Sequence, residues 1–169
     1  MNIRAASLPE HSKLSAFRRK GDFLDCYLAP VASPSISASK AALIAFGNPP
    51  AWVTKLMVLR NKLVAPLGLK AGTGHSTALE APKTLKAGSR LGPFRIYSID
   101  DNEVIMGEDD RHLDFRISVG KGEDGYHIAT WVLPHNLLGR SYLKLILPFH
   151  KVIVKTFAAR LLAQSVPKR

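Results

Sequence analysis

Three polar side chains suited to acid–base chemistry occur at alternate positions of one short segment. His112, Asp114 and Arg116 are each separated by one apolar residue. Alternate residues of a β-strand share a face and lie about 7 Å apart at the backbone, which makes these side chains predicted neighbours. A carboxylate between a histidine and an arginine could tune a proton donor or bind an anion. Any catalysis would be general acid–base work by the pair His112 and Asp114, or by His135. A salt-bridged row on the outer face of a sheet fits the same pattern, and both interpretations stay open.

A second polar group lies where the last predicted strand passes into a long helix. His135 and Asn136 occupy this junction, and Arg140 follows one turn later. Asn136 is a suitable N-cap residue, and an arginine near the positive end of the helix dipole favours an acidic partner or ligand. The group either binds a ligand or is a helix cap whose arginine pairs with Asp114 or Glu108.

Further candidates lie on the predicted helices. Arg60 and Asn61 are polar within an apolar stretch, and they form either a satisfied buried pair or a ligand contact. Tyr142 and His150 lie on the long C-terminal helix. The candidate ligand-binding residues are Arg60, Asn61, Arg116, His135, Asn136, Arg140, Tyr142 and His150.

No metal site and no cofactor are expected. The histidines show no paired ligand spacing, Cys26 is the single cysteine, and no serine lies in a nucleophile-elbow context. One cysteine cannot form an internal disulfide, and the N-terminal segment has no apolar core of signal-peptide length. We therefore expect a cytoplasmic protein.

One long amphipathic helix is predicted between Asn136 and Gln164. Its apolar residues recur at spacings of three and four, which indicates one face of a helix. The predicted stripe consists of Tyr142, Leu145, Ile146, Phe149, Val152, Ile153, Phe157 and Leu161. Lysines follow the opposite side, and Pro148 is expected to kink the helix because it lacks a backbone donor. The lysines and His150 interrupt every apolar run well short of the roughly 20 residues that span a bilayer.

The elements ahead of this helix are predicted to form an antiparallel sheet. Strands are expected at Phe23–Leu28, Phe94–Ile99, Glu103–Glu108, His112–Val119 and Tyr126–Leu133, separated by turn residues. Helix formers favour one helix over Ala38–Phe46 and a second beginning near Pro50. Residues 71–91 show no clear period and are expected to form an irregular loop.

The predicted fold class is α+β. A strand, two short helices, several antiparallel strands and a long helix follow the order of the helix-grip (START-like) architecture, in which a curved sheet wraps around the C-terminal helix. Such a sheet commonly leaves a ligand cavity beneath the helix. We expect a basic N-terminal arm over residues 1–20 and a single domain over residues 21–165.

The charge is unevenly distributed along the chain. The net charge is +11, yet nine of the 13 acidic residues lie between Asp100 and Asp124 beside only three basic ones. This predicts a basic helical part and an acidic part of the sheet, explained either by solvation alone or by an anionic partner. Nucleic acid is not the expected partner, because the triplet Arg18-Arg19-Lys20 has no interleaved aromatic residues and no known DNA-binding motif.

Several motifs in order resemble the bacterial domain-of-unknown-function 2867 (DUF2867) family over residues 22–162. They are Pro50-Ala51-Trp52-Val53, Leu56-Met57-x-Leu59-Arg60-Asn61, His112-Leu113-Asp114-Phe115-Arg116, His135-Asn136-x-x-Gly139-Arg140-x-Tyr142-Leu143 and Pro148-Phe149-His150. The resemblance implies a soluble bacterial protein related to the START-like, polyketide-cyclase-like superfamily. It implies no activity for any residue.

Three functions follow as hypotheses. The leading one is a binding module that holds a small apolar or amphipathic ligand in a sheet–helix cavity of several hundred Å³. The second is a cyclase- or hydrolase-like enzyme, which requires His112 and Asp114 to line that cavity. The third is an interaction protein that docks its basic helical side on an anionic membrane surface or partner without spanning a membrane. The sequence carries no indication of oligomeric state.

Overall fold

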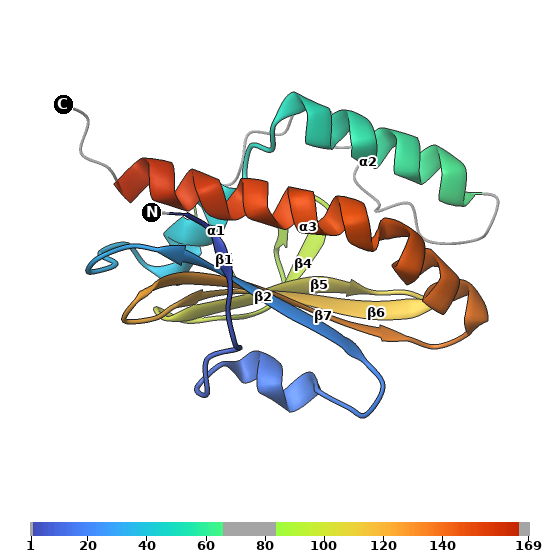
Figure 1. The fold of residues 1–169 in the computed structure, drawn as a ribbon, viewed down its shortest axis with the longest axis horizontal. Helices are drawn as coiled ribbons and strands as arrows, with labels where there is room; N and C mark the ends of the chain where they lie inside the picture. Colours follow the sequence, from blue (N-terminus) through green and yellow to red (C-terminus); the bar gives the residue numbers. More distant parts are fainter. Residues whose placement is uncertain (1, 66–83, 166–169) are drawn as a thin grey trace.

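The structure is a computed structural model that describes residues 2–65 and 84–165, so much of the loop expected at 71–91 lies outside the described residues. Seven strands form one antiparallel sheet in the order β1-β2-β7-β6-β5-β4-β3 (Figure 1). The strands are β1 (Arg4–Ala5), β2 (Phe23–Pro30), β3 (Arg90–Leu91), β4 (Phe94–Ile99), β5 (Glu103–Asp109), β6 (Leu113–Lys121) and β7 (Gly125–Pro134). The helices are the 3-10 helix η1 (Lys13–Phe17) and the α-helices α1 (Ala38–Phe46), α2 (Ala51–Val64) and α3 (Leu137–Ser165).

The predicted α+β class is confirmed. Each predicted strand and helix is present, and the bounds of β4 and α1 agree with the prediction to the residue. Strand β6 lies at the centre of the sheet and pairs with β5 and β7 along its length, as its alternation of apolar and polar residues indicates.

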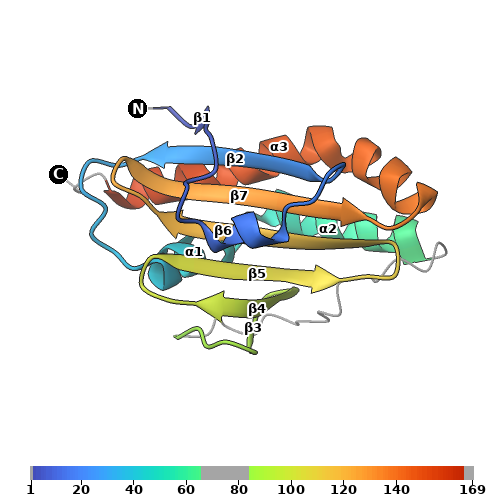
Figure 2. The same ribbon diagram turned by 90° about the horizontal axis from the view of Figure 1, so that it is seen from below.

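The two faces of the sheet are covered by different parts of the chain. Helices α1 and α3 lie against one face, here called the helix side, and α2 lies on the same side further from the sheet (Figure 1). The N-terminal arm crosses the opposite face, here called the arm side, with η1 in front of the central strands (Figure 2). Side chains of each strand therefore alternate between two separate cores.

The helix-side core is densest beneath α1 and the C-terminal half of α3. Four alanines of α1 are fully buried, which lets this helix approach the sheet closely. Phe46 of α1 packs its ring 4.5 Å from Phe157 of α3 and 6.0 Å from Phe94 of β4, measured between ring centroids. Val104, Val119 and Ile128 lie at this end of the sheet and are fully buried.

Helix α3 begins with a side-chain cap. The Asn136 side-chain oxygen accepts a hydrogen bond from the Gly139 backbone N–H at 3.0 Å, which confirms the predicted cap. A Cβ on Gly139 would lie 2.1 Å from the His112 carbonyl oxygen, so only glycine lets α3 begin this close to the start of β6. The helix includes Pro148 and bends in its N-terminal half (Figure 1).

The predicted apolar stripe of α3 is only partly buried. Phe157 and Leu161 are buried, whereas Leu145, Phe149 and Val152 are exposed on the outer side of the helix. The stripe is wider than the surface that the sheet covers. Helix α2 behaves similarly, because Val53 is buried while Leu59 is exposed.

The N-terminal arm packs on the arm side of the sheet. Strand β1 pairs with β2, and Leu14 of η1 is fully buried. Phe17 contacts Trp131 of β7 with a ring-centroid distance of 5.7 Å. Ser12 begins η1 and donates its hydroxyl to the Glu103 carboxylate at 2.5 Å. The arm therefore supplies the second apolar core and part of its hydrogen bonding.

Candidate functional site

Four side chains form a row across the helix side of the sheet. The register pairs Asp25 of β2 with Thr130 of β7, Thr130 with Ile117 of β6, and Ile117 with Met106 of β5. Met106 is fully buried, whereas Ile117 is only half-buried although it lies on the central strand. The row thus leads from a polar end at Asp25 to an incompletely covered apolar centre.

His150 covers the polar end of this row. Its Nε2 lies 3.1 and 3.2 Å from the two carboxylate oxygens of Asp25, and its ring meets Phe23 edge-on at 6.0 Å. Both partners are mostly buried, with about one sixth of each side chain exposed (17% and 16%). This contact orients the imidazole and holds α3 against β2.

Thr130 carries an unsatisfied hydroxyl next to that pair. The residue is 4% exposed, and its Oγ1 has no hydrogen-bond partner within the described residues. A buried hydroxyl without a partner costs about 1–3 kcal/mol relative to a satisfied one. In the register of the sheet Thr130 lies between Asp25 and Ile117, and its side chain shares the helix side with them.

A hydrogen bond between Arg60 and Tyr142 joins helix α2 to the first half of α3. Arg60 donates its Nε–H to the Tyr142 hydroxyl at 2.7 Å, and its guanidinium lies 5.3 Å from the centroid of the Tyr142 ring. Arg60 also donates to the Asn61 side-chain oxygen at 3.0 Å. Met57 packs from α2 against the core. The predicted candidates Arg60, Asn61 and Tyr142 are thus brought together at the contact between the two helices.

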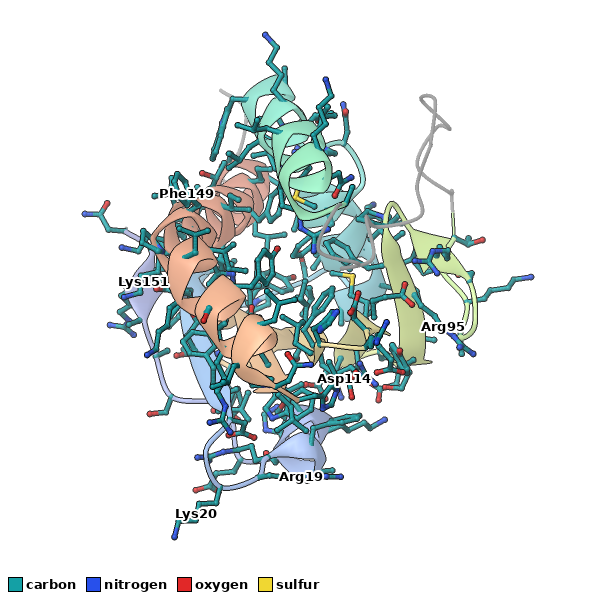
Figure 3. All side chains as sticks on the ribbon, turned by 90° about the vertical axis from the view of Figure 1, so that its right-hand side faces the viewer. Arg19, Lys20, Arg95, Asp114, Phe149 and Lys151 are labelled. Atoms are coloured by element: carbon teal, nitrogen blue, oxygen red, sulfur yellow. The ribbon has the colours of Figure 1, made fainter. Side chains whose placement is uncertain are left out.

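The predicted acid–base residues gather at the end of the sheet, where β7 passes into α3. Asp114 lies 3.1 Å from His135 Nε2 and accepts the Asp110 backbone N–H at 3.2 Å. His112 Nδ1 lies 3.0 Å from the Asn136 side-chain nitrogen, which donates to it. Leu113 and Phe115, the neighbours of Asp114 on β6, pack in the helix-side core, so the Asp114 side chain lies on the arm side. Figure 3 labels Asp114.

Arg116 lies on the arm side of the sheet and not beneath the helices. Its guanidinium pairs with Asp109 at 2.6 Å, donates to the Phe115 carbonyl at 2.8 Å, and lies 3.7 Å from the Tyr97 ring centroid and 5.3 Å from that of Phe17. Only 6% of the residue is exposed. These contacts give Arg116 a structural role beneath the N-terminal arm.

Arg140 is the remaining predicted candidate. It lies in the first turn of α3 and is exposed, and no ion pair is found for it within residues 2–65 and 84–165. The expected pairing of Arg140 with Asp114 or Glu108 does not occur there, because Asp114 pairs with His135 and Glu108 pairs with Arg90.

A second titratable cluster on the arm side was not predicted from the sequence. Cys26 Sγ lies 3.8 Å from His127 Nδ1, and His127 Nε2 lies 2.8 Å from Asp124. The order resembles a nucleophile, a base and an orienting acid. Burial, however, raises the pKa of the Cys26 thiol to about 12, which keeps the thiol protonated and unreactive. The hydrogen bond from His127 lowers the pKa of Asp124.

Asp25, Ile117 and Thr130 were likewise missed, although the sequence holds a weak signal for two of them. Asp25 alternates with Phe23 and Tyr27 in a strand whose other residues are apolar, and Thr130 alternates with apolar residues of β7. A polar residue at an apolar position of a buried strand face is a sign of a site or of a specific buried contact. Nothing in the sequence marks Ile117.

The described part of the chain also contains a hollow outside the helix-side row. An open hollow of about 620 Å³ lies away from α3, lined by His11, Ser33, Pro34, Asn102 and residues 121–123. No group of three or more His, Cys, Asp or Glu is arranged there to hold a metal ion. No single described helix is both long and apolar enough to cross a bilayer; α1 and α2 together have the required length and composition but are bent by 76°.

Comparison with known proteins assigns the chain to a family. The model of the DUF2867 family, described as a protein of unknown function, matches residues 18–157. This range includes the strands from β2 to β7, the row from Asp25 to Met106, and most of α3. No curated protein and no solved structure matches the chain. The chain therefore belongs to the DUF2867 family.

Proposed function

We propose that the protein binds a small, largely apolar or amphipathic molecule between the sheet and helices α2 and α3. The observation that carries the proposal is the incomplete cover over the centre of the sheet. Ile117 lies on the middle strand and faces the helices, a position that is normally fully buried, yet it is only half-buried. Val119, two residues further along the same face, is fully buried beneath α1.

The surroundings of Ile117 supply an apolar lining. Phe115 precedes it on the same face and is half-buried, and its ring meets Phe94 edge-on at 5.9 Å. Met57 of α2 and Ile153 of α3 are also half-buried and pack against this core. Inward-facing side chains that keep accessible surface are typical of the walls of a ligand site.

The polar end of the ligand would lie near Thr130. Its unpaired Oγ1 can donate or accept, and the His150–Asp25 pair lies next to it. The Tyr142 hydroxyl accepts from Arg60 and still has its own proton to donate. These groups favour a ligand with an apolar body and one uncharged hydrogen-bonding group.

The order and pairing of the elements add support. A first long strand pairs with the last strand, two helices follow it, and the last helix lies across the sheet. This order resembles that of the helix-grip, START-like proteins, and we propose the relation by analogy. The cyclase- or hydrolase-like alternative has less support, because Asp114 contacts His135 and Asp110 at the end of the sheet and not the helix-side row.

Filling the space over Ile117 tests the proposal. If that space is open, Ile117→Trp is accommodated and changes the free energy of unfolding by less than about 1 kcal/mol. The control Val119→Trp places the same indole ring at a fully buried position and is expected to cost about 3 kcal/mol or more. Both values are measured by urea unfolding.

Ligand binding is measured on the same Ile117→Trp variant. Fluorescence of 1-anilinonaphthalene-sulfonate is expected to rise with the wild-type protein and not with the variant. Native mass spectrometry of protein purified without denaturation is expected to show a retained small molecule on the wild type alone. Equal destabilisation by the two tryptophan substitutions, together with equal probe binding by wild type and Ile117→Trp, would refute the proposal.

A further inference from the structure

Helices α2 and α3 expose large apolar side chains on the side of the molecule that faces away from the sheet. Six of these side chains retain between 43 and 70% of their surface. They are Trp52, Val58 and Leu59 of α2, and Leu145, Phe149 and Val152 of α3. Single exposed apolar residues are ordinary on a protein surface, but six on two neighbouring helices indicate a surface that is covered by a partner.

The charged residues of the three α-helices are all basic. Helices α1, α2 and α3 contain nine Lys or Arg residues and no Asp or Glu. Exposed lysines alternate with the apolar side chains on α2 and flank them on α3. We call this surface the helical face; it consists of the six apolar side chains together with Lys55, Lys62, Lys144 and Lys151.

The spacing of residues on α3 places its exposed apolar side chains and its lysines in two adjacent stripes. Leu145, Phe149 and Val152 recur at spacings of four and three and share the outermost line of the helix. Lys144 and Lys151 are seven residues apart and form the flank. Figure 3 shows Phe149 on the side of α3 toward α2 and Lys151 on the outer flank, whereas Arg19 and Lys20 lie at the opposite end of the molecule.

We infer that the helical face docks on the surface of a bilayer that contains anionic phospholipids. Helices that lie in a membrane interface combine apolar side chains, often Trp, Phe and Leu, with lysines that reach the lipid phosphates. Both features are present on α2 and α3, which lie on the same side of the sheet with α2 further out (Figure 1). The lysines supply the attraction to an anionic surface, and the apolar side chains insert below the headgroups.

The other possible occupants of this face fit its chemistry less well. Two copies of the chain meeting through this face would bring their lysines together with no acidic residue on the helices to offset them. Nucleic acid would match the lysines but would leave Leu145 and Phe149 without an apolar partner. The inference is independent of the proposed ligand site, because these side chains point away from the sheet.

Vesicle flotation of the full chain tests the inference. The protein is expected to float with vesicles made of equal parts phosphatidylcholine and phosphatidylglycerol and to stay in solution with phosphatidylcholine alone. Binding is expected to weaken as salt is added, because screening reduces the attraction between exposed charges. Emission from Trp52, which is 43% exposed, is expected to shift to shorter wavelength on binding, and Trp52→Phe removes the shift.

Two triple variants with the same change in net charge locate the docking surface. Lys55→Glu, Lys144→Glu and Lys151→Glu together reverse three exposed charges of the helical face and are expected to lower vesicle partitioning about 100-fold or more. The control reverses Arg18, Arg19 and Lys20 to Glu, exposed residues of the N-terminal arm. It is expected to keep at least about one third of the wild-type partitioning.

A substitution among the exposed apolar side chains of α3 tests whether they insert into the bilayer in addition to the attraction of the lysines to it. Phe149→Ser, at an exposed position where folding is not at stake, is expected to lower partitioning about tenfold and to leave urea unfolding unchanged. The inference is overturned by an absence of binding to the anionic vesicles, by equal losses in the two triple variants, or by a Phe149→Ser variant that binds as wild type. Concentration-dependent dimerisation through this face would instead identify a second copy as its partner.

Discussion

Replacement of Glu103 with alanine is expected to detach the N-terminal arm from the sheet. This carboxylate is 6% exposed and accepts three hydrogen bonds on the arm side. The Ser12 and Ser118 hydroxyls donate to its Oε1 at 2.5 Å each, and the Lys13 backbone N–H donates to its Oε2 at 2.7 Å. Two of the three donors belong to the arm, which makes Glu103 its principal polar attachment.

The expected loss of stability in Glu103→Ala follows from the hydrogen-bond donors that lose their acceptor. Alanine leaves two hydroxyls and one backbone N–H without an acceptor, at about 1–3 kcal/mol for each that stays buried. Relief from burying a carboxylate offsets part of this cost, so the free energy of unfolding is expected to fall by about 3 kcal/mol. Glu103→Gln keeps an oxygen for the two serines but points its NH₂ at the Lys13 N–H, and should cost about 1 kcal/mol.

Two measurements check this prediction. Urea unfolding gives the stability, and alkylation of Cys26 by iodoacetamide reports on the arm, because Ala6 donates its N–H to the Cys26 carbonyl and packs beside the buried thiol. Alkylation is expected to accelerate in Glu103→Ala. The control Glu123→Ala removes the same charge from an exposed turn and should change neither quantity. Unchanged stability and unchanged alkylation in Glu103→Ala would show that the reasoning is wrong.

Three further predictions concern single contacts. Gly139→Ala would place a Cβ 2.1 Å from the His112 carbonyl oxygen and should lower the free energy of unfolding by about 1–3 kcal/mol, measured with urea; no loss would mean that α3 can shift there. Thr130→Val removes an unpaired buried hydroxyl, so without ligand the stability should stay equal or rise by about 1 kcal/mol; a clear loss would reveal a hidden partner. Burial raises the pKa of Cys26 from 9.0 to about 12, so as pH rises through this interval the unfolded chain ionises first and stability falls. Unfolding midpoints of Cys26→Ala should fall less steeply over the same interval, and parallel curves would contradict the shift.

The secondary structure was largely predictable because its signals are local. Alternation in β6, the alanine-rich segment of α1 and the cap at Asn136 depend on neighbours a few residues away, and each is present in the structure. Alternation also placed Asp114 and Arg116 on one face of their strand. It does not indicate which element covers that face, and the covering element is the N-terminal arm, far away in sequence.

The apolar stripes of α2 and α3 show a second limit of local signals. A period of three to four residues predicts which side chains share a face but not whether that face meets the protein or the surroundings. Phe157 is buried and Phe149 is exposed although both belong to the predicted stripe. The sequence does record the difference indirectly, because lysines lie beside the exposed part of the stripe.

The candidate site was the least predictable part. Asp25, Thr130 and Ile117 come from three strands, and only the register of the sheet aligns them. Of the residues named from the sequence, His150 joins this row, and Arg60 and Tyr142 join α2 to α3 beside it. Charged residues can be chosen as site candidates from the sequence alone. The exposure of Ile117 depends on how the helices pack over the sheet, which the sequence pattern does not indicate.

A crystal structure of protein purified without denaturation is the most direct test of the proposed ligand site. The account predicts non-protein density on the helix side of the sheet, in van der Waals contact with Ile117 and within hydrogen-bond distance of Thr130 Oγ1. Side chains of α2 and α3 packed directly onto Ile117, with Thr130 Oγ1 bonded to protein and no such density, would contradict it.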